Sequence, residues 1–348
     1  SYVPFVTYSS QRDIKEKLWR AYNSRALGGE FDNTENVKRI TALRLQIAKL
    51  LGYDCYADYV LDNRMAENTA TVNAFLKELL DETKAYGKKD YDTIAAYAHS
   101  LGLEGELMPW DFAYYSEKYK NEKYAVNDEQ IKPFLRLENV KAAIFMLANR
   151  LYGINFTEAK DITVYHPDVT AYEVTDENGK FLAVLYLDFF PRESKRSGAW
   201  MTEFSGSKVE NGKEVRPLVS LVMNFTKPTE TKPSLLTFDE FNTFLHEFGH
   251  SLHGMLGKGK YESLNGTSVY RDFVELPSQI MENWATEEEY LDLFAKHYQT
   301  GETIPSELVK KIVAAKNYLA AYANVRQLSF GMTDMAWHTL TEPYEGDV

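Results

Sequence analysis

Cysteine is nearly absent from this sequence, and its scarcity limits how the chain could hold a metal ion. The only cysteine among the 348 residues is Cys55. A single cysteine excludes an internal disulfide framework and any thiolate-rich metal cluster. Histidine and carboxylate side chains are therefore the protein ligands left for a metal. The lack of disulfides also suits a cytosolic protein, so we expect a cytoplasmic location.

Long apolar runs are missing as well. No stretch of the sequence has the length and apolar character that a membrane-spanning helix requires. The first ten residues, SYVPFVTYSS, lack the basic and apolar segments of a signal peptide. We therefore expect neither a signal peptide at this end nor a membrane partner.

Basic residues are too few for a general nucleic-acid binder. Lys and Arg number 39 against 51 Asp and Glu, which gives a net charge of −12. Non-specific binding to nucleic acid needs clustered Lys and Arg, so we expect no nucleic-acid partner. Apolar residues make up 44% of the chain, which is enough to form one large globular domain or two ordinary ones. Nothing in the composition indicates an oligomeric state.

The hydrophobic pattern divides the chain into two regions. Residues 1–153 have apolar side chains at helical spacing, with separate helices expected over 71–86 and 89–100. Residues 154–348 begin with short alternating segments and return to helices from about residue 237. This order predicts a mainly helical α+β fold, with a small, mostly antiparallel sheet beside the later helices. We expect both regions to form one continuous domain.

Two Asn-Gly pairs mark hairpins in the sheet region. Asn178-Gly179 lies between two alternating apolar segments, which predicts a hairpin with a type I′ turn. Asn211-Gly212 is a second and weaker signal of the same kind, because its flanking segments are shorter.

The most informative motif is the pentapeptide His246-Glu247-Phe248-Gly249-His250, an HExxH sequence. Histidines four residues apart project from one face of a helix and can hold one ion through their imidazole nitrogens. Glu247 would lie beside that ion without being a ligand, as a general base must. The alternative is a helix that merely carries two surface histidines.

The sequence around this motif favours a helix. Thr237 and Glu240 form a capping-box pattern that predicts the helix start. Gly249 costs about 1 kcal/mol relative to Ala inside a helix. That cost is reasonable if another segment must pass close to the helix at this point.

A catalytic zinc also needs a third protein ligand and an open position. Glu275, Gln279 and Glu282 share one stripe of a second helix, with Pro277 near its start. We expect Glu275 to be the third ligand and Glu282 to hydrogen-bond a ligating histidine, although a solvated helix face explains Glu282 equally well. His253, one turn after His250, is expected to pack beside the site rather than bind the ion.

These residues carry a resemblance to a known family. The sequence resembles the thimet oligopeptidase (M3) family of zinc metallopeptidases, and within it the bacterial peptidyl-dipeptidases most closely. The stretches that carry the resemblance are HEFGHSLHGML, Asn265-Gly266-Thr267 and RDFVELPSQIMENWA, with supporting segments at residues 165–169, 188–192, 197–201 and 334–338.

The resemblance implies one zinc ion held by His246, His250 and Glu275, with Glu247 as the general base. It also implies a two-lobed helical fold with a deep channel that admits only short, unstructured peptides. Release of C-terminal dipeptides is the expected reaction.

The resemblance further implies that a small sheet beside the zinc pairs with the substrate backbone. Gly198 and Ala199 are the candidate residues for that close approach, and an ordinary turn is the alternative. Gly266, in the glycine-containing loop before Glu275, is a further candidate for a role near the substrate.

The sequence also departs from the family pattern. Family members are longer at both ends and carry a Gly- and Tyr-rich segment with a His well after the HExxH helix. Residues 331–348 contain Tyr344 and His338 but no such run. We therefore expect the middle portion of a longer protein, which binds zinc and hydrolyses peptides weakly or not at all. The alternatives are an inert zinc- or peptide-binding fragment and an unrelated helical protein with an incidental HExxH.

Overall fold

The computed structural model describes residues 2–124 and 128–348, and the chain divides into two compact units. The helical unit comprises residues 1–125 and 314–348, and the sheet unit comprises residues 126–313. Helices account for 53% and strands for 11%, which confirms the α-rich α+β fold. Among the described helices, none is long and apolar enough to cross a membrane.

This division differs from the two regions predicted at residues 1–153 and 154–348. The last long helix of the chain packs in the helical unit, whereas the helix that ends at Tyr152 packs in the sheet unit. The expectation of one continuous domain stays a prediction.

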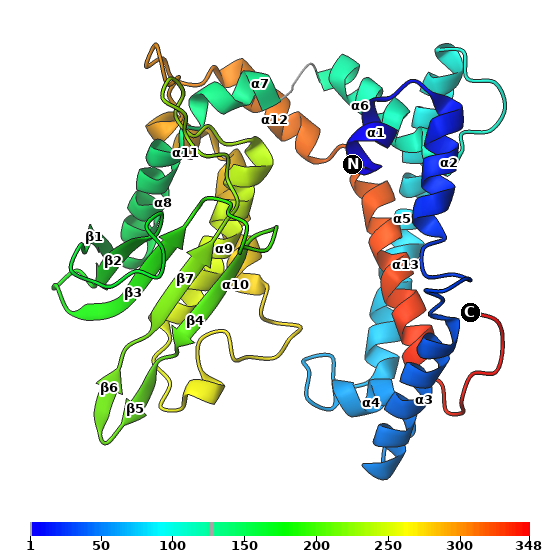
Figure 1. The fold of residues 1–348 in the computed structure, drawn as a ribbon, viewed down its shortest axis with the longest axis horizontal. Coiled ribbons are helices and arrows are strands. Elements are labelled where there is room, and N and C mark those ends of the chain that lie inside the picture. The colour runs from blue at the N-terminus through cyan, green and yellow to red at the C-terminus, as the bar shows by residue number, and fades with distance from the viewer. Residues whose placement is uncertain (1, 125–127) are drawn as a thin grey trace. The chain divides into compact units, whose positions relative to one another are not determined.

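The helical unit consists of α-helices and connecting loops over its described residues. The helices are α1 (Tyr2–Tyr8), α2 (Arg12–Asn23), α3 (Thr34–Leu50), α4 (Tyr56–Leu61), α5 (Thr69–Ser100), α6 (Pro109–Tyr124) and α13 (Ala320–His338). The long helices α5 and α13 lie side by side (Figure 1).

Helix α5 corrects the prediction of two helices over residues 71–86 and 89–100. It continues without a break through Gly87, which is buried against α13. A Cβ atom at Gly87 would lie 2.9 Å from Cγ2 of Val325 and 3.2 Å from the carbonyl oxygen of Ala321. The glycine therefore permits a close helix–helix approach and does not end the helix.

The sheet unit holds the strands and the remaining helices. Its strands are β1 (Asn155–Glu158), β2 (Thr170–Thr175), β3 (Phe181–Asp188), β4 (Trp200–Ser205), β5 (Lys208–Glu210), β6 (Lys213–Val215) and β7 (Leu218–Val222). Its helices are α7 (Asp128–Ile131), η1 (Lys132–Phe134), α8 (Leu137–Tyr152), α9 (Phe238–Leu256), η2 (Glu262–Leu264), α10 (Leu276–Glu282), η3 (Asn283–Thr286) and α11 (Glu288–Phe294), and α12 (Ser306–Lys316) reaches the division between the units.

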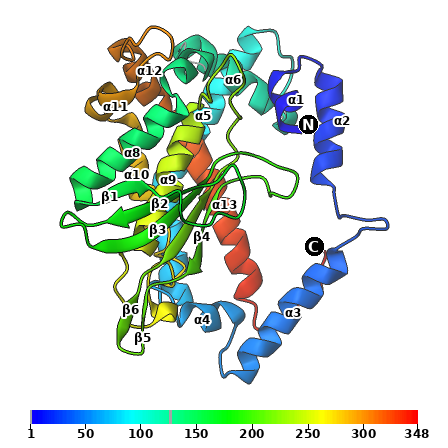
Figure 2. The same ribbon diagram turned by 60° about the vertical axis from the view of Figure 1, so that its left-hand side comes forward.

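Five of these strands form one sheet in the order β1-β2-β3-β7-β4, and β5 pairs with β6. The β3–β7 pair is parallel and the other pairs of the larger sheet are antiparallel, which confirms a mostly antiparallel arrangement. Strand β4 is an edge strand of this sheet, and α9 lies against β4 and β7 (Figure 2).

Both predicted hairpins form, but the turn type expected for the first is wrong. Asn178 does not have a positive φ, so the β2–β3 turn is not of type I′. The Asp176 side chain instead accepts hydrogen bonds from the backbone N–H groups of Asn178 and Lys180, and Gly179 takes the left-handed conformation. The β5–β6 turn has positive φ at both Asn211 and Gly212, as type I′ requires.

The main core lies between the sheet and helices α8 and α9. Successive side chains of a strand point to opposite faces, so alternate residues of β3 and β7 face these helices. Fully buried residues at this interface are Leu185, Leu187, Val219, Leu221, Phe244 and Phe248. Burial of each such side chain contributes about 1.5–3 kcal/mol. The core therefore fixes α9, and with it the HExxH motif, against the sheet.

Candidate metal centre

Helix α9 begins at the predicted capping box. The Thr237 hydroxyl accepts a hydrogen bond from the Glu240 backbone N–H at 3.0 Å, and the Glu240 carboxylate accepts one from the Thr237 N–H at 2.8 Å. Phe244 and Phe248 of the helix are fully buried against the sheet. His246 and His250 lie on another face and retain partial exposure.

The second helix, α10, crosses α9 at the glycine of the motif. A Cβ atom at Gly249 would lie 2.4 Å from the carbonyl oxygen of Pro277 and 2.6 Å from Cα of Ser278. Pro277 is in the first turn of α10, where a missing N–H costs nothing. This contact brings Glu275, which immediately precedes α10, to the histidines.

Three ligand-type atoms meet there. The Nε2 atoms of His246 and His250 lie 3.2 Å and 3.1 Å from Oε2 of Glu275. Ligand atoms about 2.0–2.2 Å from one zinc ion in a tetrahedral arrangement would be separated by about 3.3–3.5 Å. The structure thus brings together the three side chains predicted as ligands, with a spacing that a single zinc ion fits. Glu275 is exposed, so one side of the cluster is open to solvent.

Three neighbouring side chains hold the cluster in position, two directly and one through Glu282. Oε1 of Glu282 lies 2.7 Å from Nδ1 of His246, which leaves Nε2 of that ring directed at Glu275. The buried hydroxyl of Ser278 donates to Oε2 of Glu275 at 2.9 Å. Asn242, one turn before His246, donates to the other oxygen of Glu282 at 3.2 Å. Sequence reasoning missed Ser278 and Asn242, because their roles depend on contact between two helices.

Glu247 lies beside this cluster and is only 8% exposed. Burial raises the pKa of its carboxyl group, while the nearby His246 and a backbone hydrogen bond from Met201 oppose that rise. Met201 belongs to the edge strand β4. Glu247, the expected general base, therefore lies next to both the cluster and the sheet edge.

The other predicted residues do not belong to the cluster. His253 packs its ring near Phe273, and its buried Nδ1 has no hydrogen-bond partner among the described residues. Gly198 and Ala199 immediately precede β4, and the Gly198 carbonyl accepts a hydrogen bond from Asn224.

Gly266 contacts a carboxylate that sequence reasoning missed. A Cβ atom at Gly266 or at Gly254 would lie 2.6 Å from Oε1 of Glu203. Glu203 is a half-buried residue of β4, and its contacts with the N–H and hydroxyl of Thr267 are long, at 3.5 Å and 3.4 Å. Burial raises the pKa of Glu203. The sequence pattern of β4 could not have indicated this contact, because Gly254 and Gly266 belong to other segments of the chain.

Comparison with known proteins identifies the family. The model of peptidase family M3 matches residues 5–347. This chain belongs to peptidase family M3. The family is one of metallopeptidases, in agreement with the His246, His250 and Glu275 cluster.

Its relatives in the family include several oligopeptidases. Oligopeptidase A of Escherichia coli is 42% identical over 99% of this chain and 52% of its own length. Dipeptidyl carboxypeptidase of the same species is 37% identical over 97% of the chain and 50% of its own length. Saccharolysin of Saccharomyces cerevisiae is 36% identical over 97% of the chain and 49% of its own length. The chain thus spans about half the length of these relatives, and its branch within the family stays a prediction.

Proposed function

We propose that this chain carries the zinc-binding and catalytic part of a peptidase that hydrolyses short, unstructured peptides. The observation that carries the proposal is the convergence of His246, His250 and Glu275 beside the buried carboxylate of Glu247. The donor set of two imidazoles and one carboxylate is typical of a catalytic zinc with an open position. Membership of the family supports the same ion.

The chemistry divides between the ion and the protein. Zinc, when bound, supplies Lewis acidity that polarises the scissile carbonyl and makes water easier to deprotonate. Glu247 accepts a proton from the attacking water and passes it to the nitrogen of the leaving amine. Its raised pKa favours this double role, since a carboxyl group that titrates closer to neutral pH both accepts and returns a proton.

The edge strand β4 is the proposed guide for the substrate backbone. One edge of β4 pairs with β7, and no described strand pairs with its other edge. An extended peptide that adds to this edge would lie beside Glu247, because Met201 of β4 contacts that carboxylate. Gly198 and Ala199 lie where the peptide would approach the start of the strand. Release of C-terminal dipeptides is the proposed outcome, and the cytoplasm is the proposed location.

The variant Glu247→Gln tests this function. It keeps the size of the side chain and the metal ligands but removes the proton acceptor. We expect zinc content to remain that of the parent and hydrolysis of a short fluorogenic peptide to fall about 100- to 10,000-fold. Glu289→Gln, an exposed position on α11, is the matched control and should retain the parent's rate. Equal turnover by Glu247→Gln and the parent would contradict the proposal.

A second candidate is a zinc- and peptide-binding chain with little turnover. The chain spans about half the length of these relatives, so the turnover of the whole protein is a proposal for this chain. This second candidate has the same metal ligands as the first and differs from it only in the rate of peptide hydrolysis. A parent that binds zinc and peptide but is as slow as Glu247→Gln would support this candidate over the first.

A further inference from the structure

A hollow lies on the face of the sheet that is opposite α9, next to the edge strand β4. We propose that this hollow binds an acidic side chain of the peptide, at a substrate position whose side chain points away from the metal. The inference rests on the proposed function and adds a substrate preference to it.

The hollow has a volume of about 320 Å³ and is formed by three adjacent strands and the loop before β4. Trp200, Thr202 and Phe204 of β4 line it, together with Ser220 of β7. These β4 residues alternate with Met201 and Glu203, which face α9. One face of β4 is therefore directed at α9, and the other face is directed at the hollow.

A buried ionic network forms the floor of the hollow. The carboxylate of Asp188 is 1% exposed and accepts two hydrogen bonds from Arg192, at 2.8 Å and 2.9 Å. Lys195, whose side chain is 2% exposed, donates to the same carboxylate at 3.0 Å and to the carbonyl oxygens of Asp188 and Phe190. The Tyr165 hydroxyl donates to Asp188 at 3.1 Å. Each of these charged groups already has its partners within the protein.

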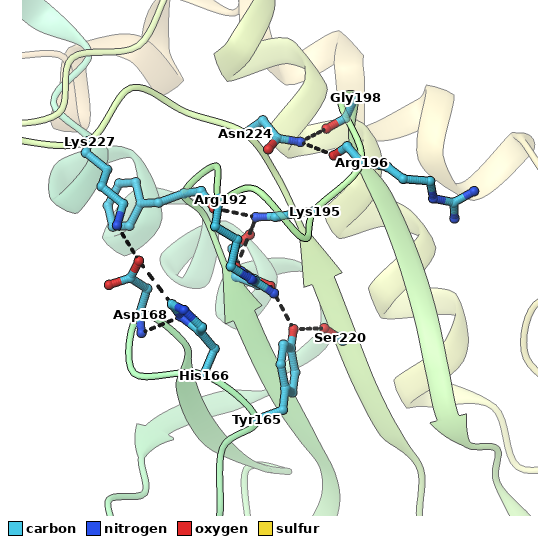
Figure 3. A network of polar contacts seen from close by, with 12 residues as sticks. Tyr165, His166, Asp168, Arg192, Lys195, Arg196, Gly198, Ser220, Asn224 and Lys227 are labelled. Carbon is cyan, nitrogen blue, oxygen red and sulfur yellow. Dashed lines mark hydrogen bonds and ion pairs between the residues drawn. The ribbon is translucent and has the colours of Figure 1, made fainter.

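The charges that line the hollow do not balance. Arg192, Lys195 and Arg196 contribute three positive charges, and Asp188 contributes one negative charge. The guanidinium of Arg196 forms no ion pair with a carboxylate of the described residues and lies 5.4 Å from the ring centroid of Trp200. Figure 3 shows this guanidinium directed away from the network around Lys195. The hollow is thus a local positive site in a chain with a net charge of −12, and the Arg196 guanidinium is its cation without an ion-pair partner among the described residues.

The backbone that carries Arg196 is held on both sides. The side-chain amide of Asn224 donates to the carbonyl oxygens of Arg196 at 2.9 Å and Gly198 at 2.7 Å (Figure 3). Lys195, the preceding residue, is fixed by its bonds to Asp188 and Phe190. Because the backbone is already ordered, binding a ligand would not add the entropy cost of ordering this loop, and within the protein only the Arg196 side chain would have to be ordered.

Strand geometry brings a substrate side chain to this site. A peptide added to β4 lies about 4.8 Å from it, and its side chains alternate between the two faces. Side chains on one face point towards α9 and the metal cluster, and those on the other point over Trp200 and Arg196. A carboxylate at the second kind of position would lie on the same side of β4 as Arg196, whose guanidinium is a group well suited to bind carboxylates.

The test uses Glu247→Gln as the parent, so that binding is measured without turnover. Peptides that differ only by Glu or Gln at each position in turn are titrated by calorimetry in the presence of zinc. We expect Glu to bind about three- to tenfold more tightly than Gln at one position. Arg196→Gln, made in the same background, should reduce this ratio to about one. Arg150→Gln, which removes the same charge from an exposed site on α8, should preserve the ratio.

Failure of the inference and failure of the proposed function give different results. Peptides that bind equally well with Glu or Gln at every position would overturn the inference and leave the proposed function intact. A Glu preference that survives in Arg196→Gln would also overturn it. Absence of binding by every peptide, with zinc present, would overturn the proposed function and the inference with it.

Discussion

At the scale of single residues, the cluster is held in place by side chains that are not among its three proposed metal ligands. The Glu282 carboxylate accepts a hydrogen bond from Nδ1 of His246, so the other nitrogen of that ring, Nε2, is directed at Glu275. Carboxylates in this position fix the ring orientation and raise the basicity of the ligand. We therefore propose a positioning role for Glu282, for which the sequence alone left a solvated helix face as an equal alternative.

The variant Glu282→Gln should weaken zinc binding without removing it. The amide is a poorer hydrogen-bond acceptor than the carboxylate, so we expect the dissociation constant for zinc to rise about 10- to 100-fold. Competition with a chromophoric chelator at constant pH measures this change. Glu289→Gln again serves as the control, and equal zinc affinity in the two variants would contradict the positioning role.

Glu203 makes a prediction about pH. Burial raises the pKa of its carboxyl group in the folded chain above the value in the unfolded chain, so the unfolded state loses the proton at lower pH. Glu203 therefore costs no stability below its unfolded pKa, and it destabilises the fold as the pH rises above that value. We expect Glu203→Gln to equal the parent in melting temperature at acidic pH and to exceed it at neutral pH. A variant that is less stable than the parent at neutral pH would contradict this assignment.

At the scale of elements, the crossing of α9 and α10 places Glu275 at the histidines. The crossing is possible because position 249 has no side chain, and the atoms nearest to it belong to the backbone of Pro277 and Ser278. Backbone atoms cannot move aside as the end of a flexible side chain can. Any added atom at this position must separate the two helices.

Gly249→Ala should therefore reduce zinc affinity more than ten-fold, even though Ala is favoured over Gly in a helix by about 1 kcal/mol. Chelator competition and urea unfolding measure the two effects. Gly331→Ala in α13 is the matched control, because its added Cβ would meet only the side chain of Leu76, at 3.3 Å. Zinc affinity in Gly249→Ala equal to that of Gly331→Ala would show that the close approach is not required.

The same elements show what the sequence could predict. The capping box at Thr237 and the helical spacing of His246 and His250 are local patterns, and each has the predicted structure. The glycine at position 249 indicated that another segment passes close to the helix, but not that this segment is α10. The turn at Asn178 was mispredicted because the Asp176 side chain binds two backbone N–H groups of the turn.

Features that depend on distant contacts were not predictable from the sequence. Gly87 suggested a helix break, but it faces α13, more than two hundred residues later in the chain. Ile14 is 46% exposed, whereas Lys15 beside it is 2% exposed and lies over the ring of Tyr114, the reverse of what the two residue types indicate. The network around Asp188 likewise requires strands and loops to meet before its charges have partners.

At the scale of the whole molecule, the proposed chemistry belongs to the sheet unit alone. The metal cluster, Glu247, the edge strand β4 and the hollow beside Arg196 all lie within residues 126–313. The negative charge of the chain reflects this chemistry only in part, since Glu247 and Glu275 are two of its 51 acidic residues. The near absence of cysteine is the more informative feature of the composition, because it leaves the metal to imidazole and carboxylate ligands.

The central claim is that His246, His250 and Glu275 together hold one zinc ion. Elemental analysis after dialysis against zinc and then against metal-free buffer tests it most directly. We expect about one zinc per chain in the parent and little zinc in His246→Ala and Glu275→Ala, while Glu289→Ala retains the parent's content. A parent without stoichiometric zinc, or ligand variants that keep as much zinc as the parent, would contradict the claim.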